Sequence, residues 1–102
     1  MLKKAETEIV CIAQFTAKEG KEQELLTALH SLMSSTHKEK GCIRYELNQN
    51  VDDPRIITFV EKFASKEAFD SHCGMPYIKG FFEKAPALVA SQSVTLHREI
   101  LP

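Results

Sequence analysis

The stretch CIRYELNQNVDDPRIITFVEKF, residues 42–63, decides the fold because it holds two strand patterns and a turn. Apolar and polar side chains alternate through its first nine residues, which predicts a strand with Ile43, Tyr45 and Leu47 on one face. The residues NVDDP favour a turn, and RIITFVEKF (55–63) predicts a second strand beside the first. Together the two strands and the turn predict a β-hairpin.

The residues before this hairpin predict one more strand and one helix. In EIVCIAQFT (8–16) apolar side chains occupy both alternation sets, which is typical of a strand buried on both faces. In EQELLTALHSLMSSTHKEKG (22–41) residues such as Leu25 and Leu29 recur at helical spacing, and Gly41 follows as a stop. This pattern predicts a four-turn amphipathic helix.

The residues after the hairpin predict a broken helical region and a last strand. Ser65 is a good N-cap for the helix SKEAFDSHC, and Gly74 and Pro76 then interrupt the helical pattern. The helical region continues through YIKGFFEKAPALVA (77–90). The stretch SVTLHREIL (93–101) predicts the fourth strand.

The order of these elements is β-α-β-β-α-β, so we expect residues 1–102 to form a single α+β domain of the ferredoxin-like kind. That plan has a four-stranded antiparallel sheet with the first and third strands at its centre and two helices on one face. The helices leave the other face uncovered, although the central strands are apolar on both faces. We therefore expect a homodimer in which a second copy packs sheet to sheet.

Composition excludes several classes of protein. Thirteen Lys and Arg against fourteen Asp and Glu give a net charge of -1, and the signs are interleaved, which disfavours nucleic-acid binding. No stretch approaches the roughly 18 apolar residues of a membrane span, and the N-terminal residues have no apolar signal region, so we expect a cytoplasmic protein. Three widely spaced cysteines indicate reduced thiols rather than a disulfide framework.

Glu61 is the first candidate for chemistry because it interrupts the apolar alternation set of the third strand. A carboxylate in apolar surroundings has a raised pKa, which suits a general base near neutral pH. The structural alternative is an ion pair with Arg44 or Arg98, or a place at the rim in water.

His72 is the second candidate, since it follows Ala68 and Phe69 at helical spacing and is expected to point toward the sheet. It could hold or move a proton on a ligand, or it could cap the end of its helix. The adjacent Cys73 is expected to be core packing, because the C-terminal end of a helix opposes a thiolate.

The remaining observations concern binding. No second His, Cys or carboxylate pair accompanies His72 and Cys73 at ligand spacing, so no metal site is expected. The chain also lacks a glycine-rich phosphate loop and a dinucleotide fingerprint. Aromatic side chains concentrate around the broken helical region and are expected to line a flat apolar pocket for a small molecule. The expected substrate-binding residues are Phe59, Phe63, Phe69, Tyr77 and Phe81.

The succession AKEGKEQEL, EKGCIRYEL, DDP, VEKFASKEAFDSH and MPYIKGF resembles the antibiotic biosynthesis monooxygenase family, from about Ile9 to His97. These are small dimeric α+β barrel proteins that include quinol monooxygenases. The resemblance implies oxidation of a quinol or another electron-rich aromatic by O₂ with no cofactor, neither flavin nor metal. It places the family's third-strand glutamate at Glu61 and its second-helix histidine at His72, and Tyr77 stands where a second histidine is frequent.

Related branches give alternatives. The haem-degrading branch has Asn, Trp and His at positions that look like Ala13, Phe63 and Phe82, so haem binding is not expected. A branch similar to the enzyme that processes phosphorylated autoinducer-2 is an isomerase, and it would need cations at the pocket. The candidates for those cations are Lys79, Arg44 and Arg98. A dimer that binds a small molecule without turning it over is a further alternative.

Overall fold

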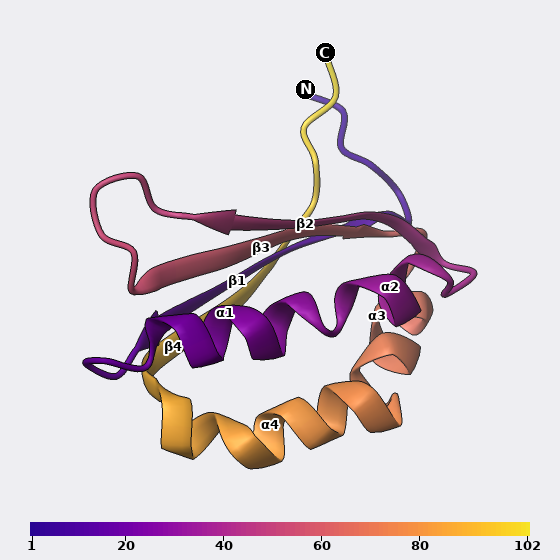
Figure 1. The fold of residues 1–102 in the computed structure, drawn as a ribbon. Helices are drawn as coiled ribbons and strands as arrows, with labels where there is room; N and C mark the ends of the chain where they lie inside the picture. Colours follow the sequence, from indigo (N-terminus) through magenta and orange to yellow (C-terminus); the bar gives the residue numbers. More distant parts are fainter.

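The protein, described for residues 1–102 by a computed structural model, is a four-stranded antiparallel sheet with all of its helices against one face (Figure 1). The α+β, ferredoxin-like prediction is therefore confirmed. The elements in chain order are β1 (Ile9–Ala17), α1 (Glu22–His30), α2 (Met33–His37), β2 (Cys42–Gln49), β3 (Ile56–Phe63), α3 (Lys66–Cys73), α4 (Pro76–Leu88) and β4 (Val89–His97).

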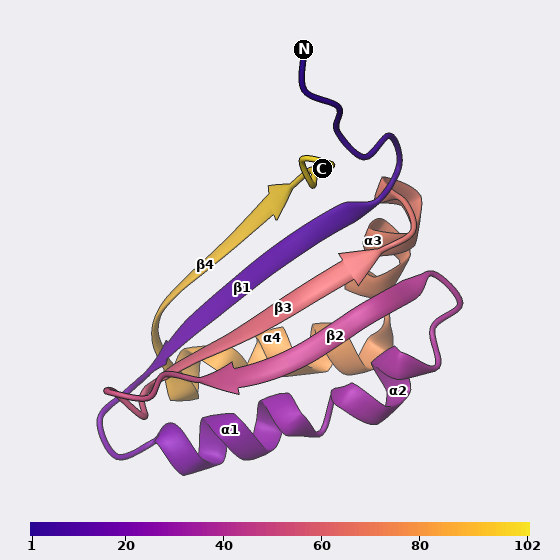
Figure 2. The same cartoon turned by 90° about the horizontal axis from the view of Figure 1, so that it is seen from above.

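The strand order in the sheet is β2-β3-β1-β4, so the first and third strands are central as predicted (Figure 2). Every neighbouring pair is antiparallel, and β2 and β3 form the predicted hairpin. The register places Cys11 of β1 on one side of Glu61 and Tyr45 of β2 on its other side. These three neighbouring side chains lie on the helix-covered face, where the central strands are buried at alternate positions.

The predicted four-turn helix is wrong as one element, because it is divided into α1 and α2 and already ends at His37. The Ser31 hydroxyl donates to the Ala28 carbonyl at 2.6 Å, and such local bonds compete with helical ones. Gly41 is not a helix stop. A Cβ at Gly41 would overlap the Cβ of Ala68, so glycine allows α3 to approach the start of β2.

Two strand boundaries also differ from the prediction. A register shift between Cys42 and Arg44 leaves Ile43 53% exposed, so Ile43 does not share the buried face of Tyr45. The last strand begins at Val89, directly after α4, and ends at His97 rather than at residue 101.

The division of the second helical region is confirmed, with α3 ending at Cys73 and α4 beginning at Pro76. The side chain of Ser65 caps α3 by accepting a hydrogen bond from the Ala68 amide at 3.1 Å, as the sequence predicted. Pro76 occupies the first position of α4, where its missing N–H leaves no bond unmade. The joint between the two helices therefore has a local cause in the sequence.

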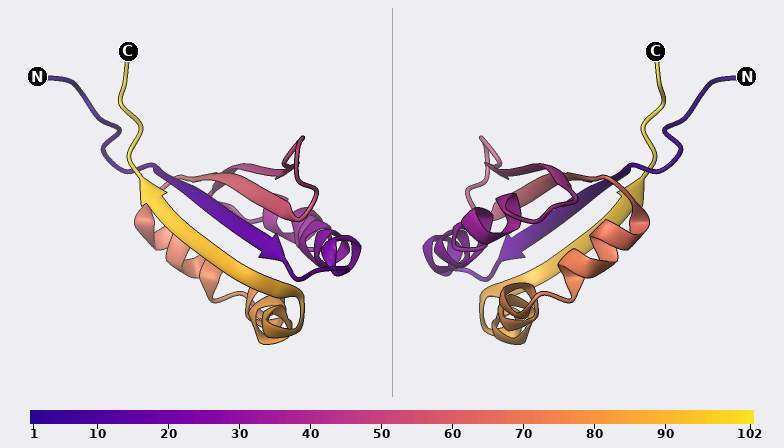
Figure 3. Two further views of the ribbon diagram at one scale, coloured as in Figure 1. Left: turned by 90° about the vertical axis from the view of Figure 1, so that its left-hand side faces the viewer. Right: turned by 90° about the vertical axis from the view of Figure 1, so that its right-hand side faces the viewer.

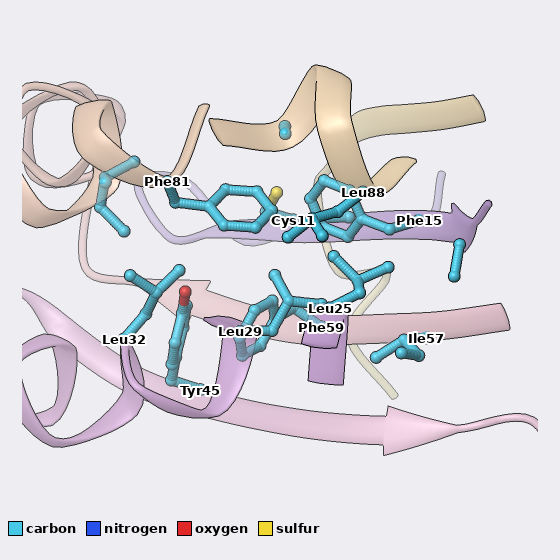
Figure 4. Packing of buried hydrophobic residues seen from close by; sticks show 14 of the residues in the cluster. Cys11, Phe15, Leu25, Leu29, Leu32, Tyr45, Ile57, Phe59, Phe81 and Leu88 are labelled. Carbon is cyan, nitrogen blue, oxygen red and sulfur yellow. The ribbon is translucent and has the colours of Figure 1, made fainter. Parts of the chain in front are cut away.

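The core fills the space between the sheet and the helices, where leucines of α1 pack against aromatic side chains of the central strands (Figure 4). Leu25, Leu29, Ile57 and Phe63 have no exposed surface, and Phe59 is 2% exposed. Burying one side chain of this size stabilises the folded state by about 1.5–3 kcal/mol relative to leaving it exposed to water. Phe63 of β3 also packs edge-on against Phe69 of α3 at a centroid distance of 5.7 Å, so the core joins the two elements that carry the predicted catalytic residues.

The opposite face of the sheet is covered by no helix (Figure 3). Val10, Ile12 and Val60 on this face are only partly buried in the single chain. The two terminal segments run side by side beyond the sheet, joined by a bridge between Lys4 and Ile100. No helix in the protein combines the length and the hydropathy that a membrane crossing requires.

Candidate functional site

Glu61 lies at the centre of the site because β3 is a central strand and its alternation turns this side chain toward the helices. The residue is 4% exposed, and its Oε1 atom has no hydrogen-bond partner. Burial raises the pKa of Glu61 to about 8; the nearby thiol of Cys11 opposes this rise and the charge of Glu39 adds to it. Glu61 is thus a buried carboxyl group that holds its proton at neutral pH.

The alternative in which Glu61 pairs with an arginine is wrong. Arg44 instead binds Glu46, with 2.9 Å between its Nη2 atom and Oε1. Arg98 donates to the backbone carbonyl of Glu8 at 3.2 Å. Both arginines lie away from the helix-covered face, so no cation compensates the buried carboxyl group.

His72 is in the last turn of α3, 4% exposed, with its ring between two carboxyl groups. Its Nδ1 atom is 3.1 and 3.0 Å from the Oε1 and Oε2 atoms of Glu39, and its Nε2 atom is 3.9 Å from Oε1 of Glu61. The ring packs against Phe63 with a centroid distance of 4.8 Å and edge-on to Tyr45 at 5.5 Å. His72 is therefore held by side-chain contacts rather than acting as a helix cap.

Glu39 is a buried member of the site that the sequence did not indicate. It belongs to the segment between α2 and β2, yet its side chain is only 8% exposed and accepts hydrogen bonds from both His72 and Tyr77. Burial and the bond to Glu39 raise the pKa of Tyr77 to about 12. Because Glu39 lies in a run of charged residues outside any periodic pattern, no signal in the sequence distinguishes it from a solvated side chain.

A cavity of about 60 Å³ lies between the sheet and the helices and has mostly apolar walls. Five of the predicted site residues line it. Its ionisable side chains are Glu61, His72, Tyr45 and two cysteine thiols. Exposed Phe82 and Val94 also belong to its wall, so it reaches the surface between α4 and β4. The full lining is Cys11, Ala13, Phe15, Leu29, Leu32, Tyr45, Phe59, Glu61, Phe69, His72, Cys73, Ile78, Phe81, Phe82 and Val94.

Two of the residues expected to bind substrate lie outside this cavity. Phe63 has no exposed surface and forms part of the core beneath the His72 ring. Tyr77 does not line the cavity, and its hydroxyl donates to Glu39. Phe59, Phe69 and Phe81 do line the cavity.

The thiols of the cavity are protonated. Cys73 lines the cavity, but much of the residue is exposed to solvent, so the expectation that it packs in the core is wrong. Burial raises the pKa of Cys73 and that of the buried Cys11, and nearby Glu61 raises both further. Burial likewise raises the pKa of Tyr45, so its hydroxyl stays neutral. Among these groups, Glu61 is the one whose pKa lies near neutral pH.

The structure places no lysine or arginine on the cavity wall. Lys79 is exposed on α4, away from the buried carboxyl groups. No group of three or more His, Cys, Asp or Glu side chains is arranged to hold a metal ion. The polar groups at the cavity are thus those of acid–base chemistry: the carboxyl group of Glu61 and the imidazole of His72, with the carboxyl group of Glu39 bonded to the far side of the imidazole.

Comparisons with known proteins give a family. The sequence model of the family described as antibiotic biosynthesis monooxygenase matches residues 8–84. A Shewanella oneidensis protein of known crystal structure is 45% identical, with a TM-score of 0.97 and 100% of both chains covered. A Synechocystis protein described as uncharacterized is 28% identical over 89 residues, which are 87% of this chain but only 60% of the relative. A Bacillus subtilis protein that carries the provisional name of a monooxygenase is 25% identical over 92 residues, covering 90% of this chain and 97% of the relative.

Proposed function

This chain belongs to the antibiotic biosynthesis monooxygenase family, and we propose that it oxidises a quinol or a similar electron-rich aromatic with O₂, using Glu61 as the general base and neither flavin nor metal. The observation that carries the proposal is the state of Glu61. Its carboxyl group is 4% exposed, has one oxygen without a hydrogen bond, and faces a cavity with apolar walls. A base in such a place can act on a substrate proton with little competition from water.

The pKa of Glu61 suits this task. A quinol hydroxyl has a pKa close to that of a phenol, about 10. An ordinary carboxylate with a pKa of 4.5 is too weak a base to take that proton readily, whereas Glu61 at about 8 reduces the difference to about two units. The apolar walls that raise the pKa of Glu61 therefore also make it a more effective base.

The chemistry needs only the substrate and O₂. Once the hydroxyl is deprotonated, the aromatic anion passes one electron to O₂, and the resulting radical and superoxide combine at a ring carbon to give a peroxide. Loss of water from the peroxide leaves a carbonyl on that carbon. A quinol and one O₂ thus give a hydroxyquinone and one water, with all of the electrons supplied by the substrate. The protein contributes the base, the orientation and the exclusion of water.

Substrate entry requires the wall of the cavity to move. A volume of about 60 Å³ is smaller than the roughly 150 Å³ of a cavity that holds benzene. The half-exposed Phe82 lies on α4, which joins α3 through the short connection at Gly74 and Met75. We infer that α4 shifts about this joint to admit the aromatic ring.

The open face of the sheet supports a homodimer in the proposed enzyme. Val10, Ile12 and Val60 lie on this face between polar side chains at its margins, and in the single chain they remain partly exposed to water. A second copy packed sheet to sheet would bury them. Such packing would also support β3, which carries Glu61, from the side opposite the helices.

The cavity does not favour the isomerase alternative, since a phosphate ester calls for cations and the cavity wall has none. The alternative of a dimer that binds without turnover differs from our proposal in one measurable respect. Only an enzyme accelerates oxygen uptake beyond the spontaneous autoxidation of the quinol.

The direct test is to mix the protein anaerobically with a set of quinols, add O₂ and record oxygen uptake. We expect uptake above the autoxidation rate, and a loss of about 10²-fold or more in Glu61→Gln, which keeps the shape but cannot accept the proton. Glu83→Gln is the matched control, because Glu83 is an exposed carboxylate on α4. Uptake equal to that of buffer with every quinol would refute the proposal and favour a binding protein.

A further inference from the structure

The two carboxyl groups beside His72 indicate which nitrogen of its ring bears the hydrogen. Glu39 approaches one nitrogen of the ring, Nδ1, at 3.0 and 3.1 Å, whereas Glu61 faces the other nitrogen, Nε2, at 3.9 Å. Both carboxyl groups and the imidazole are at most 8% exposed at their side chains. The two ring nitrogens therefore face different carboxyl groups, in a site with little contact with bulk water.

An ionised carboxylate only accepts hydrogen bonds, so Nδ1 must carry a hydrogen to bind Glu39. In a neutral imidazole the hydrogen on Nδ1 leaves Nε2 with a free electron pair. This is the reverse of the tautomer that free histidine prefers in water. We propose that Glu39 is a positioning residue that holds His72 in the Nδ1–H tautomer, so that Nε2 faces Glu61 and the cavity as a proton acceptor.

Tyr77 completes this arrangement from α4. Its hydroxyl donates to Oε2 of Glu39, so Glu39 is fixed by two donors from two different helices. The close approach of α3 at Gly41 brings the segment of Glu39 within reach of both donors. Glu39 is thereby an acceptor with a defined direction rather than a mobile surface carboxylate.

A consequence that rests on the proposed function concerns the path of the proton. Glu61 holds its proton at neutral pH and must lose it before it can take one from the substrate. Nε2 of His72 faces Oε1 of Glu61 and is the atom that can accept this proton, while Nδ1 keeps its hydrogen bond to Glu39. The proton taken from the substrate can therefore pass from Glu61 to His72, and no bulk water has to enter the cavity to remove it.

The test is to determine the His72 tautomer by ¹⁵N NMR of the labelled wild-type protein near pH 7, below the pKa of Glu61, so that Glu61 is not a second ionised acceptor at the ring. The signals are assigned by comparison with His72→Asn, because the chain has four histidines. We expect a protonated Nδ1 and an unprotonated Nε2. A wild-type protein with its hydrogen on Nε2 would overturn the proposal without any need for a variant.

Two variants separate positioning from packing. Glu39→Leu removes the acceptor and is expected to shift His72 toward the Nε2–H form, whereas Glu39→Gln keeps a carbonyl oxygen that can accept from Nδ1 and should retain the wild-type tautomer. Tyr77→Phe removes one donor to Glu39 and should leave the His72 tautomer unchanged. An unchanged tautomer in Glu39→Leu would show that the surrounding aromatic rings, not Glu39, fix the histidine.

Kinetics supply the second measurement. We expect Glu39→Leu to lower kcat for oxygen uptake by about 10²-fold with KM changed by no more than about twofold, and Glu39→Gln to recover part of the loss. If the wild type consumes no oxygen, the proposed function fails, yet the NMR result still decides the role of Glu39. If uptake is normal but Glu39→Leu is fully active, the proton path through His72 is refuted while Glu61 remains the base.

Discussion

Replacing Glu61 by glutamine should change how the stability of the protein depends on pH. Glutamine has nearly the same shape as glutamate but does not ionise, so the variant removes one titration from the core. In the unfolded chain Glu61 titrates near 4.5, whereas in the folded protein its pKa is about 8. Below pH 4.5 Glu61 is protonated in both the folded and the unfolded chain, so ionisation of this residue does not reduce the free energy of unfolding of the wild type.

Between these two pKa values the unfolded chain releases the proton and the folded protein keeps it, so the wild type loses stability as pH rises. One pKa unit corresponds to about 1.36 kcal/mol. Integrated from about pH 5 to about pH 8, the shift of Glu61 amounts to about 3 to 4 kcal/mol. The free energy of unfolding of Glu61→Gln relative to the wild type should therefore rise by this amount across the interval. Since small domains are stable by only about 5–15 kcal/mol, the effect is easily measured.

The assay is urea unfolding of both proteins at several pH values, followed by circular dichroism at one fixed protein concentration. Comparing the two proteins at each pH removes any difference that does not depend on pH, and equal m-values confirm that the same surface unfolds. Glu83→Gln, an exposed carboxylate on α4, is the control and should give curves parallel to the wild type. A difference between Glu61→Gln and the wild type that stays constant from pH 5 to pH 8 would refute our account of the buried carboxyl group.

Three further results are expected. The value of kcat/KM for a quinol should increase with pH up to about 8, because the raised pKa of Glu61 leaves the base protonated below it; a rate that is flat from pH 6 to pH 9 would contradict this. Gly41→Ala should lower the free energy of unfolding in urea by about 1–3 kcal/mol, since the added Cβ would overlap that of Ala68. If the measured free energy is unchanged, α3 can move aside to make room. Val60→Lys places a charge on the open sheet face and should convert a dimer to a monomer, as measured by light scattering. If the variant remains a dimer, the dimer does not use this face.

The sheet could be predicted from the sequence because its pattern is local. Strict alternation in residues 42–50 and apolar residues at both alternation sets of the first strand each indicate a strand by themselves. The break in the first helix could not be predicted, because its leucines keep helical spacing across Ser31. Only the structure shows that the hydroxyl of Ser31 bonds to the preceding turn and that the helix ends early.

The same distinction applies to the site. Glu61 and His72 were predicted because each interrupts an apolar pattern within its own element. Glu39 was missed because its burial depends on His72 and Tyr77, which are 33 and 38 residues away in the sequence. A charged residue outside periodic structure gives no local sign of such contacts, so its role could be found only from the folded chain.

The early end of the first helix and the buried site have a common structural basis. If the helix had continued through residue 41, the backbone before β2 would be helical, and the close approach between Gly41 and Ala68 would not form in its present geometry. Without that approach Glu39 would lie outside the reach of His72, which would then face Glu61 with no acceptor behind it. The weak helix-forming residues of α2, Ser and Thr among them, are therefore connected to the site through the position of a single carboxylate. A substitution that extends α2 should for this reason impair the orientation of His72, although no residue of α2 lines the cavity itself.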